Sequence, residues 1–141
     1  MTEIRFLGPA DLELLLGVDD GVFDGPLRPE RAAEFLAEER HHLVVALVEG
    51  RIVGFASAVH YVHPDKEPEL WIAEVGVVPA HRRAGLATRL VDALRGRARA
   101  LGCREVWVLT ERANTPALAL YRRAGGEESE DDVVLFSWKV S

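Results

Sequence analysis

Apolar and polar residues follow two different periods along the chain, and each period predicts one kind of element. Short runs rich in β-branched and aromatic residues, bounded by turn residues, predict β-strands. These strands are expected at residues 3–7, 43–48, 52–62, 70–78, 105–110 and 133–140. Apolar residues spaced three and four apart predict amphipathic helices at residues 9–18, 29–39, 84–101 and 115–124. The mixture predicts an α/β domain with a mixed (α+β) sheet.

The segment from residue 75 to 88 joins the predicted central strand to the longest predicted helix through a turn rich in Arg and Gly. Backbone N–H groups at a helix N-terminus, aided by the helix dipole and by arginines, bind phosphate. The segment lacks the G-x-x-x-x-G-K-[ST] and G-x-G-x-x-G patterns of two common phosphate loops. It carries R-x-x-G-x-A instead, at residues 82–87. The turn therefore predicts a site for a phosphate-bearing ligand of another class.

Length and composition fit one globular domain, because 141 residues with 48% hydrophobic content are enough for one core. No apolar run approaches the ~20 residues of a membrane span, so no membrane partner is expected. The start lacks a signal-peptide pattern, and Cys103 is the single cysteine. These features favour a cytoplasmic protein. No metal site is expected, since His60 and His63 stand three apart on a strand and point to opposite faces.

Charge is distributed unevenly along a chain whose formal net charge is −6. Arginines gather between residues 82 and 104, whereas carboxylates gather at Asp19, Asp20, Asp24 and residues 127–132. A basic site for an anionic cofactor beside acidic segments for a cationic substrate would produce this pattern. Solvated helix faces and acidic loops are the alternative explanation. An acidic chain without a basic, aromatic-lined stripe is not expected to bind nucleic acid.

Two motifs together resemble the GNAT N-acetyltransferase superfamily. The first is the R-x-x-G-x-A turn, and the second is N-x-x-A-x-x-x-Y-x-x-x-G, from Asn114 to Gly125. The resemblance implies one domain over residues 1–141, with a central, mostly antiparallel sheet flanked by about four helices. It implies a sheet splayed between the strands near 70–78 and 105–110, acetyl-CoA as cosubstrate without a metal, and is compatible with a homodimer. It implies these cofactor-binding residues: Val77, Val78, Arg82, Arg83, Ala84, Gly85, Leu86, Ala87, Thr88, Asn114 and Ala117.

Acetyl transfer to an amine needs a group that removes the amine proton and a group that protonates the departing thiolate. Glu74 is the candidate base, because it is a carboxylate in an otherwise apolar strand and burial would tune it. It acts directly or through water, or it binds the substrate ammonium; a structural carboxylate is the alternative. Tyr121 is the candidate acid, which the resemblance places near the CoA sulfur; a core tyrosine is the alternative. Asn114 is also a natural N-cap for the helix that follows.

The acceptor is less defined than the donor. Within the superfamily the chain looks most like the small aminoglycoside 3-N-acetyltransferases, on segments 23–27, 63–68, 74–77, 80–83 and 117–121. Gly126 departs from that pattern, where family members usually carry a bulky aromatic residue. An aminoglycoside, a small polycationic amine, would suit the acidic clusters and implies an antibiotic-resistance enzyme. Its expected contacts are Asp19, Asp20, Asp24, Tyr61 and Glu74. The alternatives are a protein amine, a polyamine or an amino-acid derivative as acceptor, or a non-catalytic CoA-binding module.

Overall fold

The computed structural model of the chain describes residues 1–82 and 84–141. Its strands are β1 (Thr2–Phe6), β2 (His41–Val48), β3 (Arg51–Tyr61), β4 (Glu69–Val77) and β5 (Glu105–Val108). Its helices are η1 (Pro9–Asp11), α1 (Leu12–Leu16), α2 (Pro29–Ala37), η2 (Pro79–His81), α3 (Leu86–Ala100) and α4 (Thr115–Arg123). The predicted helices and first five strands are thus found, with ends shifted by a few residues. The longest predicted helix begins at Leu86 rather than residue 84.

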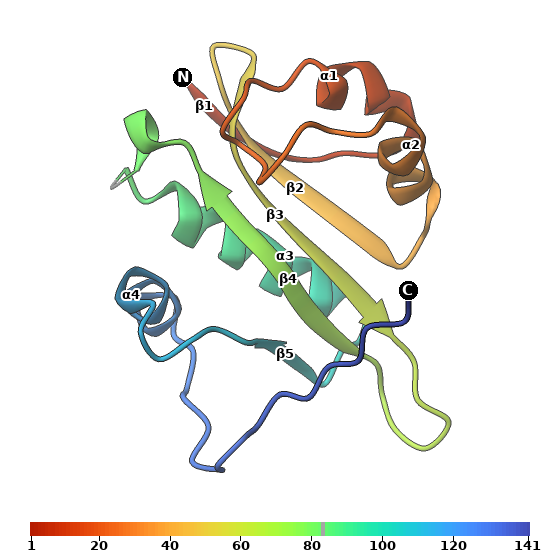
Figure 1. The fold of residues 1–141 in the computed structure, drawn as a ribbon, viewed down its shortest axis with the longest axis vertical. Helices are drawn as coiled ribbons and strands as arrows, with labels where there is room; N and C mark the ends of the chain where they lie inside the picture. The colour runs from red at the N-terminus through yellow and green to blue at the C-terminus, as the bar shows by residue number, and fades with distance from the viewer. Residues whose placement is uncertain (83) are drawn as a thin grey trace.

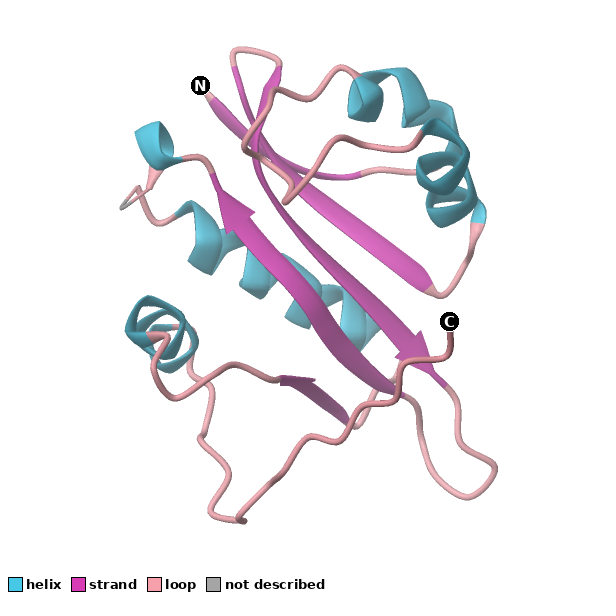
Figure 2. Ribbon diagram, in the orientation of Figure 1, coloured by secondary structure: helices cyan, strands magenta, loops and turns pink. Residues whose placement is uncertain are grey.

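One five-stranded sheet in the order β1-β2-β3-β4-β5 forms the centre of the molecule (Figures 1 and 2). The first three pairings are antiparallel, and β4 and β5 run parallel. A parallel pair needs a crossover connection, which α3 provides between them. The expected mixed, mostly antiparallel sheet is confirmed.

Two apolar clusters cover the two faces of the sheet. Alternate residues of β2 divide between them, because successive side chains of a strand point to opposite faces. Val44 packs with Leu90 and Leu94 of α3. Val45 packs on the other face with Leu15 of α1 and other apolar residues of that cluster. The helices therefore flank the sheet on both sides, with α3 alone behind its centre in Figure 1.

β4 is paired differently along its two halves. Residues 69–72 pair with β5 as well as with β3, whereas residues 74–77 pair with β3 alone. The register with β3 shifts at the same place, since Ser57 faces Glu74 and Ala58 faces Ile72. Ala73 is the extra residue of a β-bulge. The sheet therefore opens between β4 and β5, as expected.

The predicted final strand at residues 133–140 is wrong, because the structure forms no strand there. Trp138 in this segment is 81% exposed. A strand needs a hydrogen-bonded neighbour. The chain before it is instead held to α4 and its preceding loop, where Glu128 forms ion pairs with Arg112 and Arg122. The alternation of the segment is present, but its partner is not supplied within the single chain.

Candidate functional site

The N-terminus of α3 presents backbone N–H groups that have no acceptor within the helix. Gly85 is its N-cap and has φ +76°, a left-handed conformation that favours glycine. The first turn of α3 contains no acidic residue, and its leading N–H groups have no partner within the helix. The hydroxyl of Thr88 in this turn is buried and has no hydrogen-bond partner among the described residues. Backbone N–H groups at a helix N-terminus are the donors to which phosphate groups bind.

The R-x-x-G-x-A turn lies between this helix and β4. Arg82 is exposed, and its Nε donates a hydrogen bond to the carbonyl oxygen of Val77, 2.9 Å away. Ala84 and Gly85 are exposed, Leu86 is buried in the α3 core, and Ala87 is half-buried. Arg83, another expected phosphate contact, lies outside the described residues.

The open edge of β4 starts where β5 leaves it. Val78 was expected to bind the cofactor through its backbone, but its N–H donates to Val53 and its carbonyl accepts from His81. Its backbone groups are therefore already bonded within the chain. Val77 directs its carbonyl toward Arg82 instead. Both residues' roles in cofactor binding stay predictions.

The β-bulge at Ala73 determines where Glu74 points. Leu70 and Ile72 belong to the α3-side core, and strict alternation would send Glu74 to the same side. The extra residue reverses the alternation, so Val75 packs against that core and Glu74 faces the opposite surface. Glu74 is exposed there, so the expected burial of this carboxylate is wrong. Its carboxylate is therefore accessible to water.

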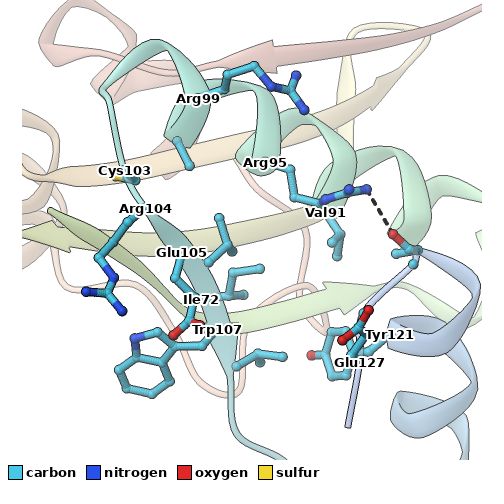
Figure 3. Close-up of a pocket in the computed structure, with 16 residues that line it drawn as sticks. Ile72, Val91, Arg95, Arg99, Cys103, Arg104, Glu105, Trp107, Tyr121 and Glu127 are labelled. Atoms are coloured by element: carbon cyan, nitrogen blue, oxygen red, sulfur yellow. Dashed lines mark hydrogen bonds between the residues drawn. The ribbon is translucent and has the colours of Figure 1, made fainter. Parts of the chain in front are cut away.

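Tyr121 lies on α4 and lines a groove bounded by α3, β5 and α4 (Figure 3). Burial raises the pKa of its hydroxyl above the usual value of 10.0. A raised pKa keeps the group protonated at neutral pH, as a proton donor requires. The half-buried side chain also packs against the α3-side core, so the core interpretation and the acid interpretation are both compatible with its position.

Asn114 is the N-cap of α4, as one of the two interpretations held. Its Oδ1 accepts a hydrogen bond from the backbone N–H of Ala117 at 3.2 Å. Its side-chain N–H groups are the donors that remain for a ligand. The exposed Asn114 side chain and the half-buried Ala117 both belong to the first turn region of α4.

The acidic residues proposed for the acceptor separate into two sets. Asp19 forms an ion pair with Arg51 at the β2–β3 turn. Asp20 and Asp24 are exposed on either side of Val22. A Cβ added at Gly76 would stand 3.3 Å from the carbonyl oxygen of Val22, so this loop lies directly against β4 two residues beyond Glu74.

Tyr61 belongs to a network at the closed end of β4. Its hydroxyl donates to Glu69 at 3.3 Å and accepts from the indole N–H of Trp107 at 3.0 Å. Burial is the main cause that raises the pKa of this hydroxyl. Trp107 stacks on Trp71 with 5.6 Å between ring centroids. The sequence analysis named Tyr61 but missed Glu69, which stands one residue before the predicted strand at residues 70–78 and is the first residue of β4.

Two kinds of feature are absent from residues 1–82 and 84–141. No helix there is long and apolar enough to cross a bilayer. No group of three or more His, Cys, Asp or Glu side chains in that part of the chain is placed to hold a metal ion.

Comparison with known proteins identifies relatives of the whole arrangement. The acetyltransferase (GNAT) family matches residues 13–126. An aminoglycoside N(6′)-acetyltransferase type 1 of Salmonella enteritidis is 30% identical over 137 residues, which cover 91% of this chain and 93% of the relative. A mycothiol acetyltransferase of Saccharomonospora viridis is 37% identical over 89 residues, covering 60% of this chain and only 29% of that protein.

Solved structures agree in fold. An aminoglycoside acetyltransferase from an uncultured soil metagenomic sample superimposes with a TM-score of 0.85 at 27% identity, covering 100% of this chain and 99% of the other. AAC(6′)-Iy, in complex with the bisubstrate analogue CoA-S-monomethyl-acetylneamine, gives a TM-score of 0.81 at 25% identity, with 99% of each chain covered. The relatives named by position are N(6′) enzymes, so the expected 3-N subgroup is not confirmed. The chain belongs to the acetyltransferase (GNAT) family and is an N-acetyltransferase.

Proposed function

We propose that the chain transfers an acetyl group from acetyl-CoA to a primary amine of an aminoglycoside or a similar small polycationic acceptor. The observation that carries the proposal is the opening between β4 and β5, where residues 74–77 lack a β5 partner and run from Glu74 toward the turn before α3. A ligand with phosphates at one end and a reactive group at the other would span this path.

The residues present fit acetyl-CoA. Gly85 and the first turn of α3 would hold the pyrophosphate, with the partnerless Thr88 hydroxyl as an added donor. Arg82, whose Nε is bonded to the Val77 carbonyl, would add a charge-assisted bond through its remaining guanidinium N–H groups. The unpaired edge of residues 74–77 would bind the extended arm by strand-like hydrogen bonds, and the Asn114 side chain would add a donor. When bound, acetyl-CoA supplies an activated acyl group.

The reaction requires two proton transfers, one from the amine and one to the departing thiolate, and residues of this chain would carry out both. An amine with a pKa near ~10 is protonated at neutral pH and must lose a proton before it can attack. Glu74, exposed on the acceptor side, would accept that proton directly or through water. Tyr121, whose raised pKa keeps it protonated, would donate a proton to the departing thiolate. In this proposal the free amine attacks the acetyl thioester directly, within a ternary complex of the protein, acetyl-CoA and the acceptor.

The acceptor assignment rests on the relatives and on charge. The aminoglycoside enzymes above are similar over nearly the whole chain. Asp20 and Asp24 lie on the loop that packs against Gly76, close to Glu74 in the fold, and would attract a polycation. We propose the 6′-amine as the acetylated position, because that is the position named for the relatives. A cytoplasmic location stays an expectation.

The test is acetyl-CoA turnover, measured by thiol release, with aminoglycosides, polyamines and short peptides as acceptors. Turnover with an aminoglycoside and a 6′-acetylated product would support the whole proposal. A 3-N product would support the acceptor class and correct the position. Turnover confined to polyamines or peptides would overturn the acceptor class. Binding of acetyl-CoA without turnover on any acceptor would overturn the proposed reaction on this panel.

A double variant, Asp20→Asn with Asp24→Asn, tests the role of this loop in binding the acceptor. Asp19→Asn is its matched control. The first pair should raise the KM for a polycationic acceptor severalfold and leave the affinity for acetyl-CoA unchanged. Asp19 is paired with Arg51, so its substitution should change the acceptor KM much less. Equal effects on the acceptor KM would contradict the assignment of the acceptor loop.

A further inference from the structure

The face of the sheet opposite α3 is covered by helices only in part. Among the described residues, the apolar cluster beneath α1 and α2 contains side chains of β2 and β3 but none of β4 or β5. In Figures 1 and 2 both helices lie on the β1–β3 side of the sheet. The side chains that β4 and β5 direct to this face therefore lack the apolar cover that β2 and β3 receive.

Two tryptophans, Trp71 of β4 and Trp107 of β5, stand side by side on this uncovered face. The residues on either side of each tryptophan pack toward α3, and successive side chains of a strand point to opposite faces, so both indoles face away from α3. Their rings are stacked, with 5.6 Å between centroids and 18° between planes. As a cross-strand pair they stabilise the sheet. Trp71 is also 37% exposed, so this aromatic platform presents an indole to solvent.

Carboxylates stand at both ends of the aromatic platform. Glu74 lies three residues beyond Trp71 and on the same face, because of the bulge in β4. Glu105 precedes Trp107 by two residues, so it also faces away from α3, and it is exposed. Neither carboxylate forms an ion pair with a residue that the structure describes. Both charges are therefore available to cationic groups of a ligand.

Glu69, which pairs with Glu105 in the register of β4 and β5, is bonded within the chain. Its carboxylate accepts a hydrogen bond from Tyr61 at 3.3 Å and lies 3.9 Å from the guanidinium of Arg104. The register also gives the span of the site, because Glu69 is five residues before Glu74. At 3.2–3.4 Å per residue, Glu105 and Glu74 are roughly 13–17 Å apart along the strand. Linked rings can bridge that span, whereas one ring cannot.

The chemistry of an amino sugar matches this arrangement. The flat faces of a saturated ring carry C–H groups that pack on an indole, and its rim carries amino and hydroxyl groups. An ammonium group near the ring adds a cation–π attraction, which is strongest for Trp. A ring over Trp71 would direct an amine of its rim toward Glu74, where the open half of β4 begins. The reacting amine would then lie beside the proposed path of the cosubstrate.

We propose that the aromatic platform holds one ring of an aminoglycoside acceptor on the indole of Trp71. Glu74 and Glu105 bind ammonium groups beyond the two ends of that ring. The inference rests on the acceptor class proposed above, and it adds a surface that selects amines carried on rings over linear polyamines. Trp71 is therefore a residue that determines acceptor specificity.

The first experiment measures the binding of sisomicin, an aminoglycoside, by calorimetric titration in the presence of CoA. Trp71→Ala should raise the Kd about tenfold, because the ring loses the surface on which it packs. Trp71→Phe keeps an aromatic face and should stay within about threefold of the wild type. The Kd of spermidine, a linear polyamine, should change much less in Trp71→Ala. An unchanged sisomicin Kd in Trp71→Ala, or an equal rise for both ligands, would overturn the proposal.

A second experiment does not depend on truncating a strand residue. Sisomicin should change the intrinsic tryptophan emission of the wild type, and Trp71→Phe should lose most of that change. Glu105→Gln should raise the sisomicin Kd severalfold. Its matched control is Glu67→Gln, at an exposed carboxylate of the β3–β4 loop, which should leave the Kd unchanged. The full emission change in Trp71→Phe, or equal Kd values for the two Gln variants, would overturn the proposal.

Thiol release separates this inference from the reaction proposed above. Turnover of sisomicin with an unchanged KM in Trp71→Ala would support the reaction and overturn the role of the platform. Sisomicin binding that depends on Trp71, without thiol release, would support the platform and overturn the reaction. A wild-type protein that binds no sisomicin would overturn both the acceptor class and the platform.

Discussion

β4 is held on both sides along residues 69–72 and on one side along residues 74–77. In the closed half, Leu70 and Ile72 are buried against α3 and Trp71 stacks on Trp107. In the open half, backbone groups lack a β5 partner and Glu74 faces water. The bulge at Ala73 separates the two. One strand thus anchors the sheet with its first half and presents unpaired groups with its second.

The largest expected effect is on the chemistry at the open half. Tyr121→Phe should lower turnover by about 10²–10⁴-fold, the usual contribution of a positioned general acid. Acetyl-CoA affinity should change little, because the ring and its packing remain. The measurement is thiol release across pH, together with calorimetric titration of acetyl-CoA. Unchanged turnover at every pH would remove Tyr121 as the acid.

The closed half should dominate stability. Leu70→Ala removes a fully buried side chain and should lower the free energy of unfolding by about 2–5 kcal/mol. Val75→Ala, on the same face but half-buried in the open half, should cost clearly less. Urea unfolding of both variants gives the two values. Equal losses would mean that the opening between β4 and β5 does not weaken packing there.

The sequence predicted the helices and strands around β4 better than the point at Ala73 where its closed half ends and its open half begins. Apolar periodicity located the helices and five strands, because burial on one or two faces leaves a direct trace in residue type. The opening was implied by the family resemblance. The bulge at Ala73 was missed, since Ala, Glu and Val in succession carry no bulge signal. Without it, the exposure of Glu74 could not be foreseen.

Other differences arise from partners that a sequence does not name. Asp19 is a carboxylate of the kind expected to bind a cationic acceptor substrate, but in the structure it is paired with Arg51, 32 positions away. The segment at residues 133–140 has the alternation of a strand, yet a strand also needs a neighbour along its edge. Tyr61 stays a predicted acceptor contact, and its bonds to Glu69 and Trp107, which place it at the closed half, could not be read from the sequence.

The pH dependence of the free energy of unfolding should distinguish the contribution of buried His42 from that of the surface carboxylates. His42 is buried, and its Nδ1 accepts from Arg97 at 3.2 Å while its Nε2 lies 2.8 Å from His60. Burial above all, then the charges of His60 and Arg97, lowers the pKa of His42 from 6.5 to about 4. The folded protein therefore binds this proton less readily than the unfolded chain.

The sign follows from that difference. Stability from neutral His42 is complete above pH 6.5 and is lost as the pH falls toward about 4, by at most about 3 kcal/mol. Urea unfolding at several pH values should show the loss. His42→Asn should flatten the dependence over this window, while carboxylates still contribute below it. Parallel curves for the two proteins would contradict the role of His42.

The smallest expected effect concerns Thr88. It tests whether a group that would bind the ligand lowers the stability of the ligand-free protein. The Thr88 hydroxyl is buried without a partner in the described residues, and such a group costs about 1–3 kcal/mol when it is unsatisfied. Thr88→Val keeps the shape and removes the hydroxyl, so the free protein should gain about 1 kcal/mol in unfolding free energy. If that hydroxyl binds the pyrophosphate, the same substitution should weaken acetyl-CoA binding a fewfold, because about 0.5–1.5 kcal/mol of hydrogen bonding is lost. Stability and affinity should thus move in opposite directions. A variant that loses both would show that Thr88 serves the fold, and one that gains stability with unchanged affinity would leave the hydroxyl outside the binding site.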